Sequence, residues 1–394
     1  MRKPDSELNQ LQKQHLLRTL HQGSKQHPGK SKLSPDRCLD FSSNDYLGLA
    51  DRAELKSAAI QAIEKFGVGS KASRLLRGGS SLHQEIETRT AAFLGTEAAL
   101  YFANGYTAAV GALTALLKKG DTVILDKRCH ACLIDGARLS GATLRIFPHN
   151  NLEKLEKLLV SIRGKAPDDS RVIIITESVF SMDGDTSPLQ EIINLKNRFG
   201  VLLLVDEAHA LGVLGPDGRG LSHHIGESRS VDFRIATFGK AVGSAGGVVA
   251  ASSKWIDLIL NKARSFIYST APPHAQAAAA LAGLDIIESN EGDQLRKILL
   301  GNASLLCERL SINLPSAAII PLILGEETIA LEASAYLQES GIIVAAIRYP
   351  TVARGTARLR ISLSATHSRD DIINLADHLG RLLGTEKFTL APSP

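Results

Sequence analysis

The sequence predicts an α/β protein whose central sheet is mostly parallel, with helices on both faces and a smaller α+β domain attached. Six short apolar runs show no in/out alternation, which is typical of parallel strands buried on both faces. Helix-length segments separate the runs, and this β-α order predicts a doubly wound sheet. The expected strands are 122–126, 143–147, 171–176, 201–206, 234–238 and 247–251, and the helices between them include 106–118, 151–163 and 188–199.

The pattern changes near residue 285, and this change predicts a second domain. Beyond that point helices alternate with short apolar strands, and the expected helices are 291–312, 327–340 and a last one from about 370. At the other end of the chain we expect an amphipathic helix over 5–21 and a linker over 22–36. The expected domains are a large cofactor domain over 46–285 and a small domain built from 1–45 and 286–394.

The composition argues against several classes of protein. The 394 residues include 45 Lys plus Arg and 41 Asp plus Glu, a formal net charge of +4 without a basic block, so nucleic acid is not an expected partner. No apolar run of about 18 residues predicts a membrane span, and no apolar segment near the start indicates a secretory signal. The four cysteines are too sparse for a disulfide scaffold, so we expect a reducing compartment, the cytoplasm.

Two short motifs need a more cautious interpretation. The run DEAH at 206–209 resembles a helicase box, which requires a phosphate loop elsewhere in the chain. The segment GSKQHPGKS at 23–31 has five residues between its glycines, whereas that loop has four. The sequence therefore does not favour a nucleotide hydrolase. Cys129 and Cys132 form a C-x-x-C pair without the second pair of a zinc site, so we expect buried or half-buried thiols and no metal.

Residues suited to cofactor chemistry follow the predicted strands. Asp206 ends one strand with His209 three residues on, Lys240 follows the next strand on a glycine-rich turn, and Gly105–Tyr106 opens a helix. Ligands of doubly wound sheets bind at such strand ends. A carboxylate for a ring nitrogen, an amine for an aldehyde and helix N–H groups for a phosphate are what pyridoxal 5'-phosphate requires. Taken alone, Asp206 could be a helix cap and Lys240 a surface lysine.

These motifs resemble those of the α-oxoamine synthases, and the resemblance extends over almost the whole chain. It implies a pyridoxal-phosphate enzyme with the aspartate-aminotransferase-like fold. Cys132 and Ala109 depart from the family, which more often has serine and asparagine there. The motifs are SNDYLGL (43–49), SRLLRGGSSLHQEIE (73–87), FANGYTAAV (102–110), TESVFSMDGDTSPL (176–189), DEAHALG (206–212), GPDGRG (215–220), TFGKAVG (237–243) and IYSTAPP (267–273).

The resemblance implies catalytic roles for Lys240, His130 and Asp206. Lys240 would bind the cofactor aldehyde and then act as the base for the substrate Cα proton. Asp206 would pair with the ring nitrogen, His209 with the ring hydroxyl, and His130 would stack on the ring and face the substrate. For His130 the plainer alternative is a core histidine that plays no catalytic part.

Further residues would bind the phosphate and the substrates. Gly105 and Tyr106 would offer backbone N–H groups, and Ser181 and Thr237 would add hydroxyls to the cofactor site. Thr270 would reach the phosphate of a partner subunit, so the resemblance implies a homodimer. Arg360 would hold the substrate carboxylate, unless it is a solvated strand arginine, and Arg18 and Thr351 would contact the acyl substrate.

The stretch 346–367 is most similar to family members that join L-alanine to a pimeloyl thioester in biotin synthesis. The sequence leaves open whether the thioester is carried by coenzyme A or by acyl carrier protein. Two alternatives remain: a sister activity that uses glycine with acetyl- or succinyl-coenzyme A, and a non-catalytic relative that acts as a binding partner. The intact Lys240, Asp206 and His209 argue against the second.

Overall fold

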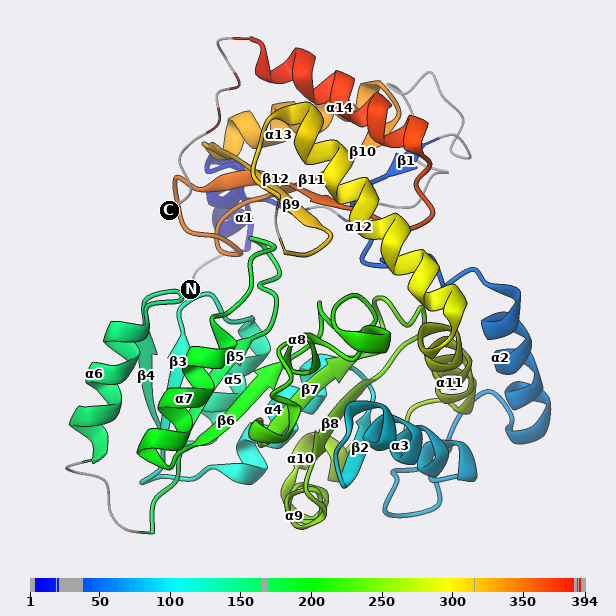
Figure 1. Ribbon diagram of the computed structural model, residues 1–394, viewed down its shortest axis with the longest axis vertical. Coiled ribbons are helices and arrows are strands. Elements are labelled where there is room, and N and C mark those ends of the chain that lie inside the picture. The colour runs from blue at the N-terminus through cyan, green and yellow to red at the C-terminus, as the bar shows by residue number, and fades with distance from the viewer. Residues whose placement is uncertain are drawn as a thin grey trace. The chain divides into compact units, whose positions relative to one another are not determined.

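The computed structural model describes residues 4–18, 20, 38–163, 169–314, 316–385, 388 and 390. Contacts divide the chain into two compact units, drawn in Figure 1. The large unit comprises residues 45–181 and 185–298, and the small unit comprises residues 1–44, 182–184 and 299–394. The domain boundaries expected from the sequence stay a prediction.

A seven-stranded sheet forms the centre of the large unit. Strand β8 runs antiparallel to both of its neighbours, while the other six strands share one direction. The expected mostly parallel sheet is therefore confirmed. Its order is β2 (Ala98–Phe102), β8 (Gly247–Ala251), β7 (Phe233–Thr237), β6 (Leu202–Asp206), β5 (Val172–Glu177), β3 (Thr122–Asp126) and β4 (Thr143–Phe147).

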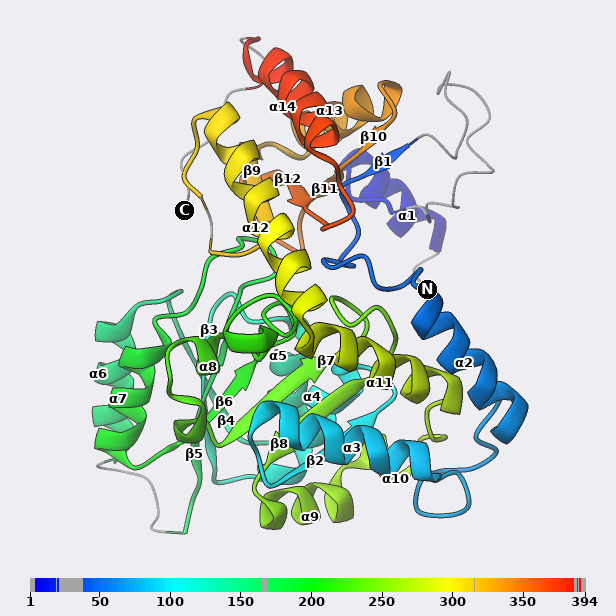
Figure 2. The same cartoon turned by 45° about the vertical axis from the view of Figure 1, so that its right-hand side comes forward.

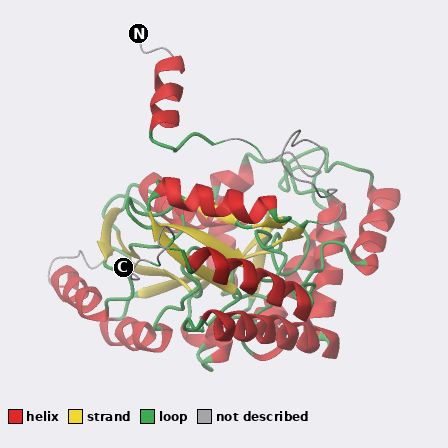
Figure 3. Ribbon diagram, turned by 90° about the horizontal axis from the view of Figure 1, so that it is seen from above, coloured by secondary structure: helices red, strands yellow, loops and turns green. Residues whose placement is uncertain are grey.

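Both faces of this sheet are buried, which explains the apolar runs without alternation. Within β5, Ile173 and Ile175 belong to one apolar core, whereas Ile174 between them belongs to the other. Helices lie on both sides of the strands (Figure 3). Residues of α4 (Gly105–Leu116), α5 (Ala131–Leu139), α9 (Ser253–Lys262) and α10 (Arg264–Ile267) build the first core, and those of α6 (Leu152–Arg163), α7 (Leu189–Phe199) and α8 (Leu221–His224) build the second.

Three further helices belong to the large unit, and one of them, α11, packs against the other two (Figures 1 and 2). They are α2 (Ala53–Phe66), α3 (Ser81–Leu94) and α11 (His274–Glu288). Two short 3₁₀ helices, η2 (Pro216–Gly218) and η3 (Ser228–Ser230), also belong to the large unit. The helix α12 (Asn290–Leu310) has residues in both units.

Local hydrogen bonds fix where α4 begins. The side chain of Asn104 accepts the backbone N–H of Thr107 at 2.8 Å, and the Thr107 hydroxyl accepts the Asn104 N–H at 3.2 Å. This reciprocal capping box makes Gly105 the first residue of the helix. The first N–H groups of a helix have no carbonyl partner within it. Gly247, at the start of β8, packs directly against this turn.

The small unit contains a three-stranded antiparallel sheet, a parallel strand pair and helices. The sheet order is β11 (Ala345–Ile347), β12 (Ala357–Ser362) and β9 (Ile319–Gly325), and β1 (Leu39–Asp40) pairs with β10 (Ile342–Ile343). The helices are α1 (Pro4–Lys13), α13 (Glu327–Glu339) and α14 (Arg369–Leu383), with part of α12. None of the helices in the described part of the chain combines the length and apolar character needed to cross a bilayer.

The helix expected over 5–21 is shorter than predicted. It ends at Lys13, and His15 has a φ of 55°, in the left-handed region that interrupts a helix. The linker expected over 22–36 lies outside the described residues.

The close packing of Gly247 gives a stability prediction. A Cβ there would lie 2.4–2.5 Å from the backbone atoms of Asn104 and Gly105, so the Gly247→Ala protein must displace the start of α4. We expect its free energy of unfolding to fall by about 1–3 kcal/mol, as for other overpacked sites, measured by denaturant titration. Gly69→Ala is the control, because a Cβ there meets nothing within 4 Å. Equal effects of the two substitutions would contradict the prediction.

Candidate active site

Three neighbouring strands of the large unit end in polar side chains. Glu177 ends β5, Asp206 ends β6 and Thr237 ends β7, and Glu177 and Asp206 are register partners. Because parallel strands finish at the same edge of a sheet, these side chains gather there. Gly105, which opens α4 after β2, and Lys240, three residues beyond β7, join the same edge of the large unit.

Lys240 begins a chain of three hydrogen-bonded side chains. Its Nζ lies 2.8 Å from Nε2 of His209, and Nδ1 of His209 lies 2.6 Å from the hydroxyl of Tyr46. His209 and Tyr46 are buried. Both ring nitrogens of His209 are therefore occupied, and its imidazole has a fixed orientation beside the lysine amine.

The carboxyl group of Asp206 is buried near this lysine. One of its oxygens accepts the Ala208 N–H at 2.9 Å. Burial raises the pKa of Asp206, while the charge of Lys240 opposes that shift. A buried carboxylate is costly unless a cation or several hydrogen bonds compensate it. The site is thus suited to a ligand that presents a cationic N–H group to Asp206.

A second buried carboxyl group, Glu177, was absent from the sequence-based set. It accepts the backbone N–H of His130 and so connects β5 to the loop before α5. Burial, reinforced by the neighbouring Asp206, raises the pKa of Glu177 well above its usual value. The strand predicted from the sequence ends one residue too early, at 176, and so leaves out Glu177, the buried residue that ends β5.

Tyr46 was also missed, although it lies within the SNDYLGL motif. No regular spacing connects it to His209, which is 163 residues away along the chain. Only the fold brings the two side chains together.

The start of α4 lies close to the polar end of β7. The Thr237 hydroxyl donates to the Gly246 carbonyl at 2.9 Å and accepts the Gly239 N–H at 3.2 Å. A Cβ on Gly105 would lie 3.4 Å from the Thr237 Cβ, so the bare backbone of α4 approaches β7 closely. The arrangement fits a phosphate group held by N–H groups and a hydroxyl.

The remaining candidates of the large unit differ in exposure. Ser181 is buried, His130 is exposed at the start of α5, and Thr270 is exposed and forms an isolated bridge with Ser73. Tyr106, the second residue of α4, is exposed, and its hydroxyl donates to Asp135 at 2.7 Å. Cys129 and Cys132 are buried and unbridged, as expected.

Of the four predicted substrate residues, His130 lies in the large unit, and Arg18, Thr351 and Arg360 lie in the small unit. Arg360 is 5% exposed, so it is not a solvated strand arginine. Both of its terminal nitrogens lie 3.1 Å from the Asn44 side-chain oxygen, and Nη1 also donates to the Ser362 hydroxyl at 2.6 Å. Arg18 and Thr351, which are both exposed, are joined by an Nη2–Oγ1 hydrogen bond of 3.1 Å.

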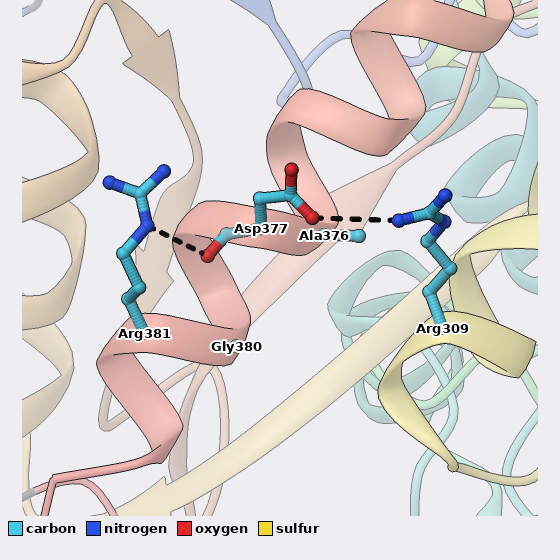
Figure 4. A pocket seen from close by; sticks show the side chains of 5 residues that line it. All are labelled: Arg309, Ala376, Asp377, Gly380 and Arg381. Carbon is cyan, nitrogen blue, oxygen red and sulfur yellow. Dashed lines mark hydrogen bonds and ion pairs between the residues drawn. The ribbon is translucent and has the colours of Figure 1, made fainter.

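A hollow of about 440 Å³ in the small unit lies away from these residues. Figure 4 shows the side chains that line it, with Arg309 from α12 facing Asp377 of α14 at 3.5 Å. Its lining residues are Arg309, Ala376, Asp377, Gly380 and Arg381. None of the sequence-predicted candidates contributes to it.

A sequence comparison decides the family of the chain. Residues 36–379 match the family described as aminotransferase class I and II. The chain belongs to the class I and II aminotransferase family. The predicted aspartate-aminotransferase-like fold is thereby confirmed.

Similar proteins show to which subgroup of the aminotransferase family the chain belongs. A protein of Geobacter sulfurreducens named 8-amino-7-oxononanoate synthase is 42% identical, with 95% of this chain and 96% of the relative aligned. A solved 8-amino-7-oxononanoate synthase from Francisella tularensis superposes with a TM-score of 0.73 at 30% identity, covering 88% of this chain and 98% of that one. A lysine-to-alanine variant of serine palmitoyltransferase from S. paucimobilis, solved with a bound PLP–myriocin aldimine, gives a TM-score of 0.88 at 28% identity, with 96% of each chain covered. The resemblance to the α-oxoamine synthases is confirmed.

A histidine between two carboxylates anchors the loop that carries Ser181. Nδ1 of His149 lies 3.0 Å from Asp126, and its Nε2 lies 2.7 Å from Asp185. The backbone carbonyl of Asp185 accepts the Phe180 N–H at 2.9 Å, next to Ser181. Although burial opposes the charged ring, the two carboxylates raise the pKa of His149 to about 9.

This raised pKa predicts a loss of stability at high pH. His149 stabilises the fold fully below its unfolded pKa, about 6.5, and the contribution disappears as the pH rises through about 9. We expect the free energy of unfolding to fall by about 2–3 kcal/mol between pH 6 and 10 because of this group. His149→Gln should flatten that pH dependence, whereas His224→Gln, at an exposed site, should not. Parallel curves for wild type and His149→Gln would refute the assignment.

Proposed function

We propose that this chain condenses L-alanine with a pimeloyl thioester to give 8-amino-7-oxononanoate, carbon dioxide and the released thiol. The observation that carries the proposal is the contact of Lys240 with His209 beside the buried carboxyl group of Asp206. It lies within a chain that is 42% identical, over 95% of its length, to a relative named for this activity.

Pyridoxal phosphate is the cofactor that these groups fit. Bound there, it would supply a protonated ring that accepts the electron pair left on the alanine Cα when that carbon loses its proton. Asp206 keeps the ring nitrogen protonated, because a buried carboxylate is stabilised by a cationic N–H. The backbone at Gly105 and Tyr106 binds the phosphate, and the hydroxyls of Thr237 and Ser181 complete the cofactor site.

The hydrogen-bonded side chains of Lys240, His209 and Tyr46 control the proton that leaves the alanine Cα. Lys240 would hold the cofactor aldehyde, and its free Nζ amine would remove the Cα proton of the bound alanine. Nε2 of His209, which contacts the amine of Lys240, would bind the ring hydroxyl once the amine holds the cofactor, and Tyr46 on Nδ1 fixes the orientation of His209. His130 covers the ring face and faces the substrate.

Arg360 binds the alanine carboxylate in this proposal. Its contacts with Asn44 and Ser362 hold the guanidinium in one orientation before substrate arrives, which suits bidentate recognition of a carboxylate. Arg18 and Thr351, already joined to each other, contact the acyl substrate. We leave open whether coenzyme A or acyl carrier protein delivers the acyl group.

We further propose a homodimer in a reducing compartment such as the cytoplasm. Thr270 is exposed on a segment that is anchored next to it by the Ser70 hydroxyl, which donates to the Pro272 carbonyl at 2.6 Å. A fixed, exposed hydroxyl of this kind supports a contact with the phosphate bound by a partner subunit. The four unbridged cysteines support the reducing compartment.

Product analysis with matched substrates tests the proposed function. The purified protein, loaded with pyridoxal phosphate, should form the amino ketone from L-alanine and pimeloyl-coenzyme A or pimeloyl-acyl carrier protein. Lys240→Ala should lower that rate by at least about a thousandfold while the protein still folds, because it removes both the covalent anchor and the base. Ketone formed from glycine and acetyl-coenzyme A, with none from alanine and a pimeloyl thioester, would replace the proposal with the sister activity.

A further inference from the structure

His130 serves as the N-cap of helix α5 as well as a candidate cofactor contact. Its ring nitrogen Nδ1 accepts the backbone N–H of Cys132 at 3.3 Å. A side chain that accepts an N–H two positions into a helix satisfies one of the donors left over at the helix start. Histidine is an unusual residue for this position, where Ser, Thr, Asp and Asn predominate.

This cap determines which nitrogen of the ring carries the proton. A backbone amide can only donate, so Nδ1 must present its lone pair and cannot hold a proton. In the neutral ring the proton is then on Nε2. The alternative tautomer and the doubly protonated ring would each direct an N–H toward the Cys132 N–H.

A second donor reinforces the first. The Cys132 Sγ lies 3.0 Å from the same Nδ1, close enough for its thiol hydrogen to bind the lone pair. Cys132 is 3% exposed, and burial raises its pKa, so it stays a thiol and keeps that hydrogen.

We propose that Cys132 is a positioning residue that locks His130 as the neutral Nε2–H tautomer, with its ring held against the start of α5. The proposal deepens the proposed function, since the ring so held is the one expected to cover the cofactor. It gives the C-x-x-C pair a role for one of its members: Cys132 orients His130, while Cys129 donates to the Ile175 carbonyl at 3.7 Å and does not contact the ring.

The charges around His130 are compatible with a neutral ring. Asp206 and Asp135 favour a proton on the imidazole, whereas Lys240 and desolvation oppose it, and the pKa of His130 is lowered overall, mainly by desolvation. Glu177 binds the backbone of the same residue. The positive end of the α5 dipole also opposes a cation at the N-cap. A neutral ring avoids repulsion with Lys240 while leaving an N–H group for a substrate oxygen.

Nitrogen NMR of the cofactor-free protein tests this assignment directly. Histidine is labelled with ¹⁵N, and the His130 signals are identified by their loss in His130→Gln. We expect an unprotonated Nδ1 and a protonated Nε2 in the wild type at neutral pH. Cys132→Ala should raise the proton affinity of the ring about three- to tenfold, the range that corresponds to losing one neutral hydrogen bond, and Cys132→Ser should restore the wild-type value.

Cys129→Ala is the matched control, because it removes the other buried thiol of the same motif without touching His130. A protonated Nδ1 in the wild type, or a His130 titration in Cys132→Ala that matches those of wild type and Cys129→Ala, would overturn the proposal. If Cys132→Ala fails to fold, Cys132→Val, which likewise lacks a side-chain donor, takes its place, and a titration that matches that of the wild type would overturn the proposal. These readouts need no cofactor and no turnover, so their failure is distinct from failure of the proposed function.

Discussion

The buried carboxyl group of Asp206, within the electrostatic reach of Lys240, is the constraint on which the rest of the site depends. A carboxylate removed from water loses several kcal/mol of solvation unless a cation offsets the loss. The sheet enforces that removal, because β6 is an interior strand covered on both faces. Lys240 approaches from the turn after the neighbouring strand β7. The fold thus holds a buried carboxyl group whose charged form a cationic partner stabilises, and a protonated pyridine nitrogen is such a partner.

Around this pair, loops are held by polar side chains that are themselves buried or partly buried and hydrogen-bonded. Glu177 holds the backbone of His130, Tyr46 holds the ring of His209, and His149 joins two carboxylates beside the loop of Ser181. Each link connects segments far apart in sequence, so the site is assembled by the fold and not by any one motif. Such supporting contacts explain why the candidate residues can have defined orientations although several of them are on loops.

The sequence predicted the parts of this site that depend on local pattern. Apolar runs without alternation located the strands, and Asp206, Lys240 and Gly105 followed because cofactor residues collect at strand ends. Tyr46, Glu177 and Asn44 escaped prediction because their importance comes from contacts across long sequence separations, such as the 316 residues between Asn44 and Arg360. The N-terminal helix was predicted too long because its polar amphipathic pattern continues past His15, where the backbone turns into the left-handed region.

The central claim is that Lys240 is the residue that holds pyridoxal phosphate covalently, opposite the carboxyl group of Asp206. Incubation of the purified protein with pyridoxal phosphate, reduction with borohydride and peptide mass analysis test it most directly, because reduction makes the linkage permanent. The account predicts one phosphopyridoxyl group per chain, on the peptide that contains Lys240. Attachment at a different lysine, or no attachment at saturating cofactor, would contradict it.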